Sequence, residues 1–319
     1  MKHAFVLLLL LSAATAVSAA NRQRPVLDGP WQRLVEYPGH HLNDFAVFRA
    51  CDGRWHAIGI MGNGSALSEV SFFHSSGPGL AAKLENHPPL LEAHPPDVSL
   101  TPRKHAPHIL YRGDTLHMFY RRPGGTIMHV RGRDPFEWDG LGEEVFTERD
   151  ARDPCIVQEG HRYLMYYCQS KVSDGVMRSC IVARTSADLA SWSEAATVLV
   201  DTQREANHSL LESPAVLRRP EGWYLFISNR RMWRTGDDPK RPPPITVTTV
   251  SFSQDPLDFG RGESPWFHQI QNVHAAEIVE AEGRTWLVRV GTDGRTANKP
   301  MPGLTGWLEI APLRWELAE

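Results

Sequence analysis

Residues 152–168 read RDPCIVQEGHRYLMYYC. An acidic residue beside proline leads into a short apolar run, a turn with glycine, and a second apolar run rich in aromatic residues. Two short apolar runs joined by such a turn are typical of a β-hairpin. Four other segments follow the same order: NDFAVFRACDGRWHAIGI from Asn43, HAPHILYRGDTLHMFYR from His105, ESPAVLRRPEGWYLFISN from Glu212 and HAAEIVEAEGRTWLVRVG from His274. The hairpin pattern therefore occurs five times.

The spacing of the five copies indicates a repeat architecture. The third residue of each copy recurs after 62, 47, 60 and 62 residues, and each interval has room for four short strands. Repeats of this size with four strands are typical of β-propellers, which pack their blades radially and so protect most strand edges. We predict an all-β fold, a five-bladed β-propeller with four antiparallel strands per blade. A β-sandwich is disfavoured because five hairpins match. The tail, residues 303–319, is expected to be a closing strand that could pair with the first blade.

The N-terminus has a different character. Lys2 and His3 precede an apolar run over residues 4–11, and small residues follow as far as Ala19. This order predicts a signal peptide over residues 1–19 with cleavage after Ala19, and the apolar run is too short to span a bilayer. We expect residues 20–319 to form the propeller, secreted or periplasmic and without a membrane partner.

Composition and cysteine content narrow the function classes. The chain is 41% hydrophobic and 22% charged, as in ordinary globular proteins, and its formal charge of -3 gives no reason to expect nucleic acid. Export permits disulfides. A cross-strand pair between Cys168 and Cys180 and buried free thiols both remain open. Together with Cys51 and Cys155, these cysteines have no spacing that suggests a zinc site.

The first two residues of the five copies include the candidate catalytic groups. Three copies open on a carboxylate, namely Asp44, Asp153 and Glu212, and the other two open on His105 and His274. The innermost strand of every propeller blade lines the central channel, so equivalent residues should surround one mouth of it. Unpaired charge is costly to bury, so a ring of acids and histidines indicates a site for a polar substrate rather than a structural core.

Glycoside hydrolysis needs this set of groups. One carboxylic acid protonates the leaving oxygen, and a second carboxylate attacks the sugar or activates water. A third can stabilise the transition state or raise the pKa of the acid by like-charge repulsion. We therefore predict Asp44, Asp153 and Glu212 as catalytic residues.

The order of these motifs resembles the five-bladed furanosidases of glycoside hydrolase families 32, 68 and 43. Asn43-Asp44 matches the start of the family 32 motif Asn-Asp-Pro-Asn-Gly, although Phe45-Ala46-Val47 replaces the rest. Arg152-Asp153-Pro154 matches Arg-Asp-Pro, and Glu212 matches the acid of Glu-Cys, with Ser213 in place of cysteine. The resemblance covers essentially residues 20–319 and implies a divergent, single-domain relative.

The resemblance implies roles for the three acids. By analogy with family 32, Asp44 would be the nucleophile, Asp153 the transition-state stabiliser and Glu212 the acid/base. By analogy with family 43, they would be the general base, the pKa modulator and the general acid of an inverting enzyme. A histidine of the fifth blade often lies on the axis in family 43, which His274 could match.

These observations predict a secreted glycosidase for a furanoside-type or related glycan derived from fructan, arabinan or xylan. The expected partner is an oligo- or polysaccharide, and no cofactor or metal is expected. A cation on the axis is compatible with such a fold, but no ligand cluster in the sequence supports one. The expected substrate-binding residues are Asn43, Arg152, His105, His108 and His274.

Two alternatives remain open on the same scaffold. One is a glycan-binding propeller without catalysis, which the incomplete first motif suggests. The other is a glycoside phosphorylase, for which Arg230, Arg231 and Arg234 could supply a cationic phosphate pocket.

Overall fold

The fold was analysed in a computed structural model of the chain. The structure describes residues 22–63, 68–91, 103–173, 175–202, 210–230, 246–262, 267–291 and 305–318. The predicted signal peptide lies outside the described residues. No helix in the described part of the chain is long and apolar enough to cross a lipid bilayer.

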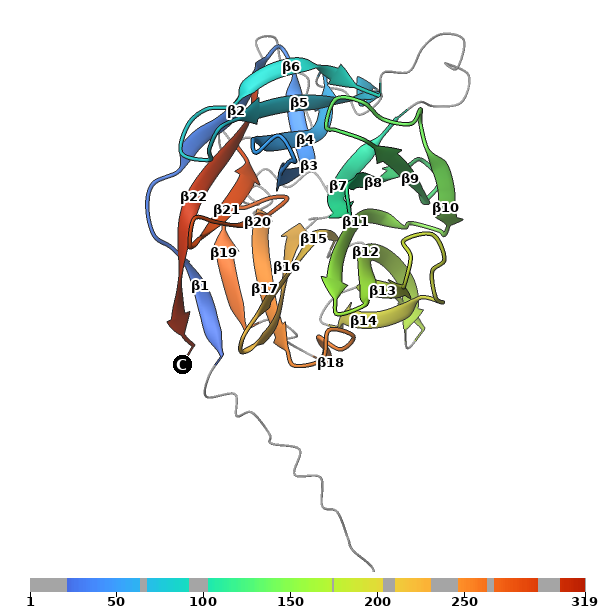
Figure 1. The fold of residues 1–319 in the computed structure, drawn as a ribbon. Helices are drawn as coiled ribbons and strands as arrows, with labels where there is room; N and C mark the ends of the chain where they lie inside the picture. Colours follow the sequence, from blue (N-terminus) through green and yellow to red (C-terminus); the bar gives the residue numbers. More distant parts are fainter. Residues whose placement is uncertain are drawn as a thin grey trace, which may run out of the picture.

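Five antiparallel sheets surround a common axis (Figure 1). The first is formed by β3 (His41–Arg49), β4 (Trp55–Gly62), β5 (Ser71–Gly77) and β6 (Glu85–Leu90). The second is formed by β7 (His105–Arg112), β8 (Thr115–Arg122), β9 (Thr126–Gly132) and β10 (Glu143–Thr147). The third is formed by β11 (Arg152–Glu159), β12 (Arg162–Ser173), β13 (Val176–Ser186) and β14 (Ala196–Asp201).

The fourth blade comprises β15 (Leu210–Arg219), β16 (Gly222–Arg230), β17 (Thr246–Ser253) and β19 (His268–Gln271). A short strand, β18 (Gly260–Gly262), pairs in parallel with β14 at the outer edge of the third blade. The fifth blade is built on β20 (Glu277–Ala281), β21 (Arg284–Val290) and β22 (Thr305–Leu317). The predicted five-bladed propeller with four antiparallel strands per blade is confirmed.

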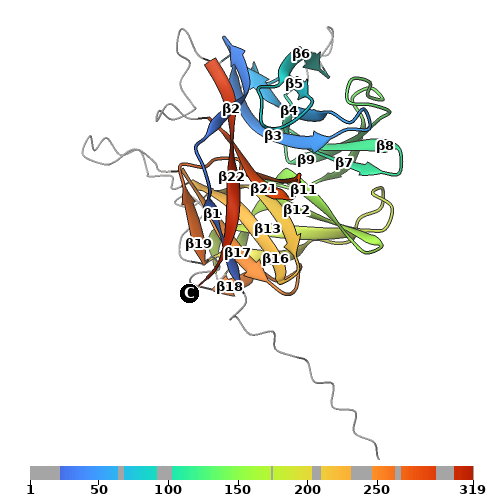
Figure 2. The same ribbon diagram turned by 60° about the vertical axis from the view of Figure 1, so that its left-hand side comes forward.

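The two ends of the described chain close the ring together. β1 (Gln23–Leu27) and β2 (Gln32–Pro38) both pair with β22, which also pairs with β21 (Figure 2). The expectation that the C-terminal tail would pair with the first blade is therefore wrong. N-terminal strands complete the fifth sheet instead, because the long β22 offers its outer edge to both β1 and β2.

The apolar core lies between the blades. Five clusters of buried residues are each shared by two neighbouring blades. Strand β12 shows the rule: Tyr163 and Met165 pack toward the second blade, whereas Leu164 and Tyr166 pack toward the fourth. Successive side chains of a strand point to opposite faces, and both faces of a blade are buried here. The long apolar runs of the sequence follow from this double burial.

The same alternation explains the cysteines. Cys168 packs in the cluster facing the fourth blade and Cys180 in the cluster facing the second. Cys168 pairs with Ile181 and Cys180 with Gln169, so the two thiols project from opposite faces of one sheet. All four cysteines are free, and three of them are buried. Of the two open interpretations, the structure therefore shows free thiols.

Candidate active site

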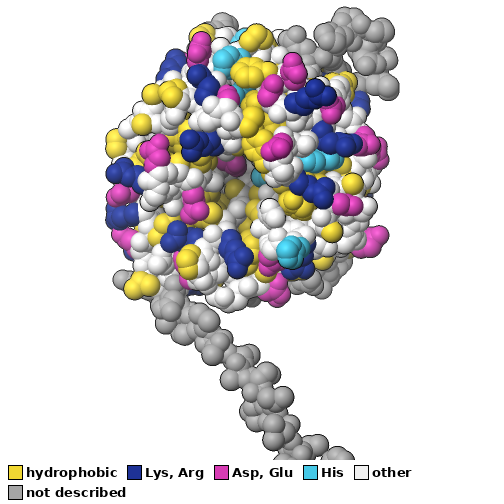
Figure 3. Space-filling model, in the orientation of Figure 1, with side chains coloured by type: hydrophobic (Ala, Val, Ile, Leu, Met, Phe, Trp, Pro, Cys, Tyr) yellow, Lys and Arg dark blue, Asp and Glu magenta, His cyan; other side chains and the backbone are white. Residues whose placement is uncertain are grey.

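A hollow lies where the inner strands of all five blades begin. It holds about 340 Å³ of empty space, part of which is open to the surrounding solvent. The space-filling view shows that the molecule is hollowed at the centre of the ring (Figure 3). The hollow is lined by Asp44, Phe45, Ala106, Pro107, His108, Asp153, Pro154, Ser213, Pro214, Ala275, Ala276 and Glu277. These are the second, third or fourth residues of the five copies of the repeat.

Backbone irregularities at these positions aim the side chains. In the first four blades, the pairing of the innermost strand with the next strand shifts register at the second or third residue of the copy. Ala106, Asp153, Ser213 and Ala275 also have φ angles between 47° and 56°. Positive φ is uncommon for residues other than glycine, and bulges re-aim side chains beside active sites. The repeat thus builds one ring of side chains around the axis.

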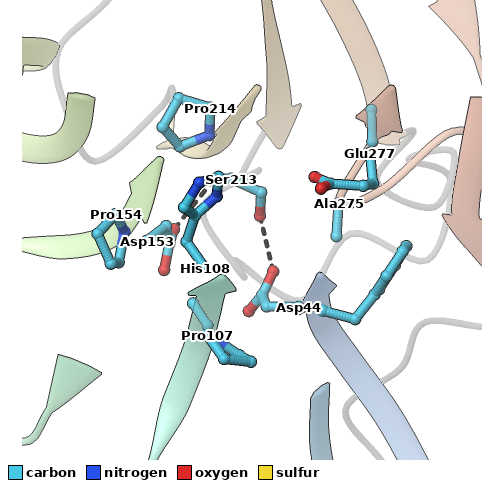
Figure 4. Close-up of a pocket in the computed structure, with 12 residues that line it drawn as sticks. Asp44, Pro107, His108, Asp153, Pro154, Ser213, Pro214, Ala275 and Glu277 are labelled. Carbon is cyan, nitrogen blue, oxygen red and sulfur yellow. Dashed lines mark hydrogen bonds between the residues drawn. The ribbon is translucent and has the colours of Figure 1, made fainter. Parts of the chain in front are cut away.

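Asp44 is held in this ring by two hydrogen bonds. Ser213 Oγ donates to Asp44 Oδ1 at 2.7 Å (Figure 4). Asn43 Nδ2 donates to Oδ2 of Asp44 at 3.0 Å. Burial raises the pKa of Asp44 well above its usual value, and the charges of Asp153 and Glu212 raise it further. The bond from Ser213 acts in the opposite direction. The protonated form of Asp44 is therefore favoured more strongly in the hollow than it would be in water.

Asp153 is the second carboxyl group in the hollow. The backbone N–H of Ser213 donates to its Oδ2 at 3.0 Å, and Arg152 Nε lies 3.9 Å from the same oxygen. Arg152 is itself positioned by donating from Nη2 to the carbonyl oxygen of Leu211 at 2.7 Å. Burial raises the pKa of Asp153, and the positive charge of Arg152 offsets part of that rise. Ser213 thus binds both acids, one through its hydroxyl group and the other through its backbone.

Glu212 precedes the residues with which β15 lines the hollow, Ser213 and Pro214. Its charge raises the pKa of both Asp44 and Asp153, so it lies within electrostatic range of them. The structure therefore brings the three acids of blades one, three and four into one region. Their catalytic roles stay a prediction.

His105 belongs to a network beside the hollow. Its Nε2 lies 2.9 Å from Oε2 of Glu69, and Arg121 Nη1 donates to its Nδ1 at 2.8 Å. His41 Nε2 contacts the other oxygen of Glu69 at 2.8 Å. These hydrogen bonds lower the pKa of Glu69 to about 2 against the opposing effect of burial. The charge of Glu69 also contributes to the raised pKa of Asp44, which couples this network to the acids.

His108 and His274 occupy different surroundings. His108 lines the hollow, and its Nε2 lies 2.9 Å from the carbonyl oxygen of Ile156. Burial lowers the pKa of His108 to about 4, so the ring is neutral at pH 7. A carbonyl oxygen only accepts, so Nε2 carries the proton and Nδ1 is left as an acceptor. His274 is buried directly before Ala275 and Ala276, which line the hollow.

Three residues of this region were not among the predicted site residues. Ser213 was noted only as a replacement for cysteine, and Glu69 lies between two strands, outside the repeat. Glu277 is the fourth residue of the fifth copy, the position that His108 holds in the second. Comparing the fourth positions of the copies would have identified Glu277, whereas no signal in the sequence points to Glu69.

Two other kinds of site, a metal site and a phosphate pocket, would also need charged groups in this region. Within the part of the chain that the structure describes, no three His, Cys, Asp or Glu residues form a group fit to hold a metal ion. Arg231 and Arg234, proposed above for a phosphate pocket, lie outside the described residues.

Comparisons with known proteins locate the fold among carbohydrate-active enzymes. No protein-family model matches the chain, and no curated protein matches it in sequence. Among solved structures, the family 32 β-fructofuranosidase of Bombyx mori is 16% identical with a TM-score of 0.58, and the match covers 85% of this chain and 61% of that enzyme. The chain thus spans about three fifths of that enzyme's length.

Two further solved structures match this chain over most of their own length. The α-L-arabinanase of Cellvibrio cellulosa, solved in complex with arabinohexaose, is 15% identical with a TM-score of 0.61, covering 86% of this chain and 93% of that one. An endo-1,4-β-xylanase of Bacteroides thetaiotaomicron is 13% identical with a TM-score of 0.55, covering 79% and 86%. At such identities the likeness shows the fold. The chain is a five-bladed propeller that matches glycoside hydrolases of families 32 and 43 in structure.

Proposed function

We propose that this protein is a glycoside hydrolase that cleaves O-glycosidic bonds of a furanoside-type or related glycan derived from fructan, arabinan or xylan. The observation that carries the proposal is the Asp44–Ser213–Asp153 linkage in the axial hollow, with Glu212 in electrostatic range. A pair of carboxyl groups, one that donates a proton and one that is ionised, is what cleavage of a glycosidic bond requires.

The proposed roles follow from the surroundings of each acid. Asp44 is the nucleophile or general base, because hydrogen bonds from Ser213 and Asn43 hold its carboxyl group in the hollow. The bond from Ser213 also favours the ionised form, against burial and the charges of the other acids. Asp153, beside Arg152, binds sugar hydroxyl groups, and its charge raises the pKa of Asp44. Glu212 is the proton donor to the leaving oxygen. Arg152, Asn43 and His108 orient the substrate or the acids.

The proposal includes export. The order of charged, apolar and small residues at the N-terminus supports a signal peptide, and extracellular glycans are the substrates that a secreted enzyme would meet. N-terminal sequencing of the protein recovered from the medium or periplasm tests this part. A first residue of Ala20 supports cleavage after Ala19, and a retained Met1 contradicts it.

Hydrolysis is tested by incubating the protein with fructans, arabinans and xylo-oligosaccharides and measuring released reducing sugar. Wild type is compared with Asp44→Asn, Asp153→Asn and Glu212→Gln. Loss of a nucleophile, base or acid is expected to lower kcat at least about a thousandfold. Unchanged hydrolysis by Glu212→Gln would remove the proton-donor role. The anomeric configuration of the first product, read by proton NMR, distinguishes retention from inversion.

A second candidate function has one observation in its favour. Phe45-Ala46-Val47 replaces the rest of the family 32 motif, and Phe45 itself lines the hollow. A glycan-binding propeller without catalysis would give saturable sugar binding, no turnover, and binding that is insensitive to Glu212→Gln. Turnover of any sugar in the panel excludes it.

A further inference from the structure

Glu277 is a further carboxyl group that lines the axial hollow, one that the proposed mechanism does not use. It begins β20 on the fifth blade and lines the hollow. Figure 4 shows its carboxyl group directed into the hollow, on the opposite side from Asp153 and facing the side chain of Ser213. The fourth residue of the second copy, His108, lines the hollow in the same way.

The surroundings of Glu277 decide its protonation. Burial raises its pKa to about 8, and a hydrogen bond donated by the backbone N–H of Val47 on β3 lowers the pKa by less. At pH 7 the group is therefore mostly a neutral carboxylic acid. A neutral carboxyl group is both a hydrogen-bond donor and an acceptor. Val47 occupies part of its accepting capacity, and the remaining donor and acceptor positions face the hollow.

The neutral state also suits the neighbouring charges. Asp44 and Asp153 line the same hollow. The charge of Asp153 raises the pKa of Asp44, and the charge of Glu212 raises the pKa of both. Another ionised carboxylate would add repulsion that a neutral acid avoids. A neutral donor–acceptor on the wall opposite Asp153 is suited to a sugar hydroxyl group, which likewise both donates and accepts.

We propose that Glu277 is a further substrate-binding residue, which holds a hydroxyl group of the bound sugar from the fifth-blade wall of the hollow. The proposal rests on the proposed function in taking a sugar as the ligand, but it does not require that the sugar be cleaved. It adds a contact from the fifth blade to those of blades one to four.

Two substitutions separate recognition from folding. Glu277→Gln keeps an oxygen that accepts from Val47 and an N–H₂ group that donates into the hollow. Glu277→Leu removes both functions at similar volume. Thermal unfolding of each variant establishes that it is folded. Glu277→Gln should melt near wild type, whereas Glu277→Leu should melt somewhat lower, because the backbone N–H of Val47 loses its acceptor.

The probes are arabinohexaose, xylohexaose and kestose, and binding is measured by titration calorimetry in the full chain. A Glu212→Gln background is used where a probe is hydrolysed during the titration. At pH 6.5 we expect Glu277→Gln to bind within about threefold of the parent, and Glu277→Leu to bind at least about tenfold more weakly, as loss of a buried hydrogen bond predicts.

The pH dependence gives a readout that a structural role would not change. Asp44 on β3, His108 on β7 and Asp153 on β11 line the hollow with Glu277, and Cys155 on β11 lies within electrostatic range of it. Glu212 on β15 acts on Asp44. His108, with its pKa lowered to about 4, and Cys155, with its pKa raised to about 12, titrate outside pH 7–9. Loss of the Glu277 proton should weaken binding by the parent about tenfold between pH 7 and pH 9. Glu277→Gln should lack that decrease, while any contribution of the aspartates persists in it.

The inference is overturned if Glu277→Leu binds as tightly as the parent, if the parent and Glu277→Gln have the same pH profile, or if the wild type binds none of the three probes. Binding that depends on Glu277 without any hydrolysis supports this inference and contradicts the proposed hydrolase. Hydrolysis without dependence on Glu277 supports the proposed hydrolase and contradicts this inference.

Discussion

The hydroxyl group of Ser213 donates a 2.7 Å hydrogen bond to Oδ1 of Asp44, joining the fourth blade to the first across the axis. The backbone N–H of the same residue donates to Asp153 on the third blade at 3.0 Å. One residue therefore sets the separation of two acids that enter from different blades. Its positive φ of 50° places the hydroxyl group and the N–H in directions that serve both carboxyl groups.

Ser213→Ala should move the acid limb of the activity profile. The lost bond stabilised the ionised form of Asp44, so its removal raises the pKa of Asp44 further. We expect the acid limb of kcat/KM to move up by about one pH unit, so that activity at a fixed pH on that limb falls about tenfold. The pH–rate profile measures this. Ser253→Ala, at the end of β17 and outside the hollow, is the control, and an unmoved acid limb would contradict the role of Ser213.

Glu69→Gln should destabilise the protein above pH 5. The pKa of Glu69 is depressed to about 2 in the fold, so its contribution is fully present above its unfolded value of 4.5 and is lost as the pH falls toward 2. The contribution is roughly 3 kcal/mol at neutral pH. Urea unfolding at pH 6, 4.5 and 3.5 should show a difference from wild type that narrows below pH 4.5. Glu85→Gln, an exposed acid, should show little difference at any pH.

His74→Gln should make stability less sensitive to acid. His74 is buried, Nδ1 has no hydrogen-bond partner among the described residues, and burial lowers its pKa to about 3. The unfolded chain therefore binds a proton first, and wild type loses stability as the pH falls below 6.5. Wild type should lose about 2 kcal/mol more than the variant between pH 6.5 and pH 4.5. Denaturant titrations at both values measure it, with exposed His161→Gln as the control. Equal losses would show that His74 does not titrate as inferred.

Gly59→Ala should disturb the site through packing. A Cβ atom at Gly59 would lie 2.5 Å from Cβ of Phe45 and 2.6 Å from Cε1 of Phe73. Phe45 follows Asp44 and lines the hollow, so the displaced ring moves the acid with it. We expect a loss of about 1–3 kcal/mol in unfolding free energy together with reduced activity. Gly79→Ala, where a Cβ would meet nothing within 4 Å, should leave both unchanged.

Much of the fold could be predicted because its signals are local. Each blade buries both faces, so its strands read as apolar runs, and the turns between them carry glycine. Five copies of one hairpin pattern then require a closed repeat. Which strands close the ring could not be predicted. β1 and β2 show no copy of the pattern, and they join the fifth sheet only because the edge of β22 is free to pair with them.

The candidate site was predicted in part for a related reason. Asp44 and Asp153 share the second position of their copies, and equivalent positions of a closed ring must meet at its axis. Glu69 lies outside the repeat, so its contacts with His41 and His105 depend on how a connecting segment packs against two blades. No local pattern carries that information.

The amino-acid sequence by itself determined the five blades, their order and the blades from which the acids come, because side-chain periodicity and turn residues act over a few neighbouring positions. The tertiary structure decided which groups meet. It joined Ser213 to both aspartates, separated Cys168 from Cys180 across a sheet, and directed Glu277 into the hollow. Those outcomes depend on bulges, backbone angles and contacts between residues far apart in the chain, which exist only once the ring has closed.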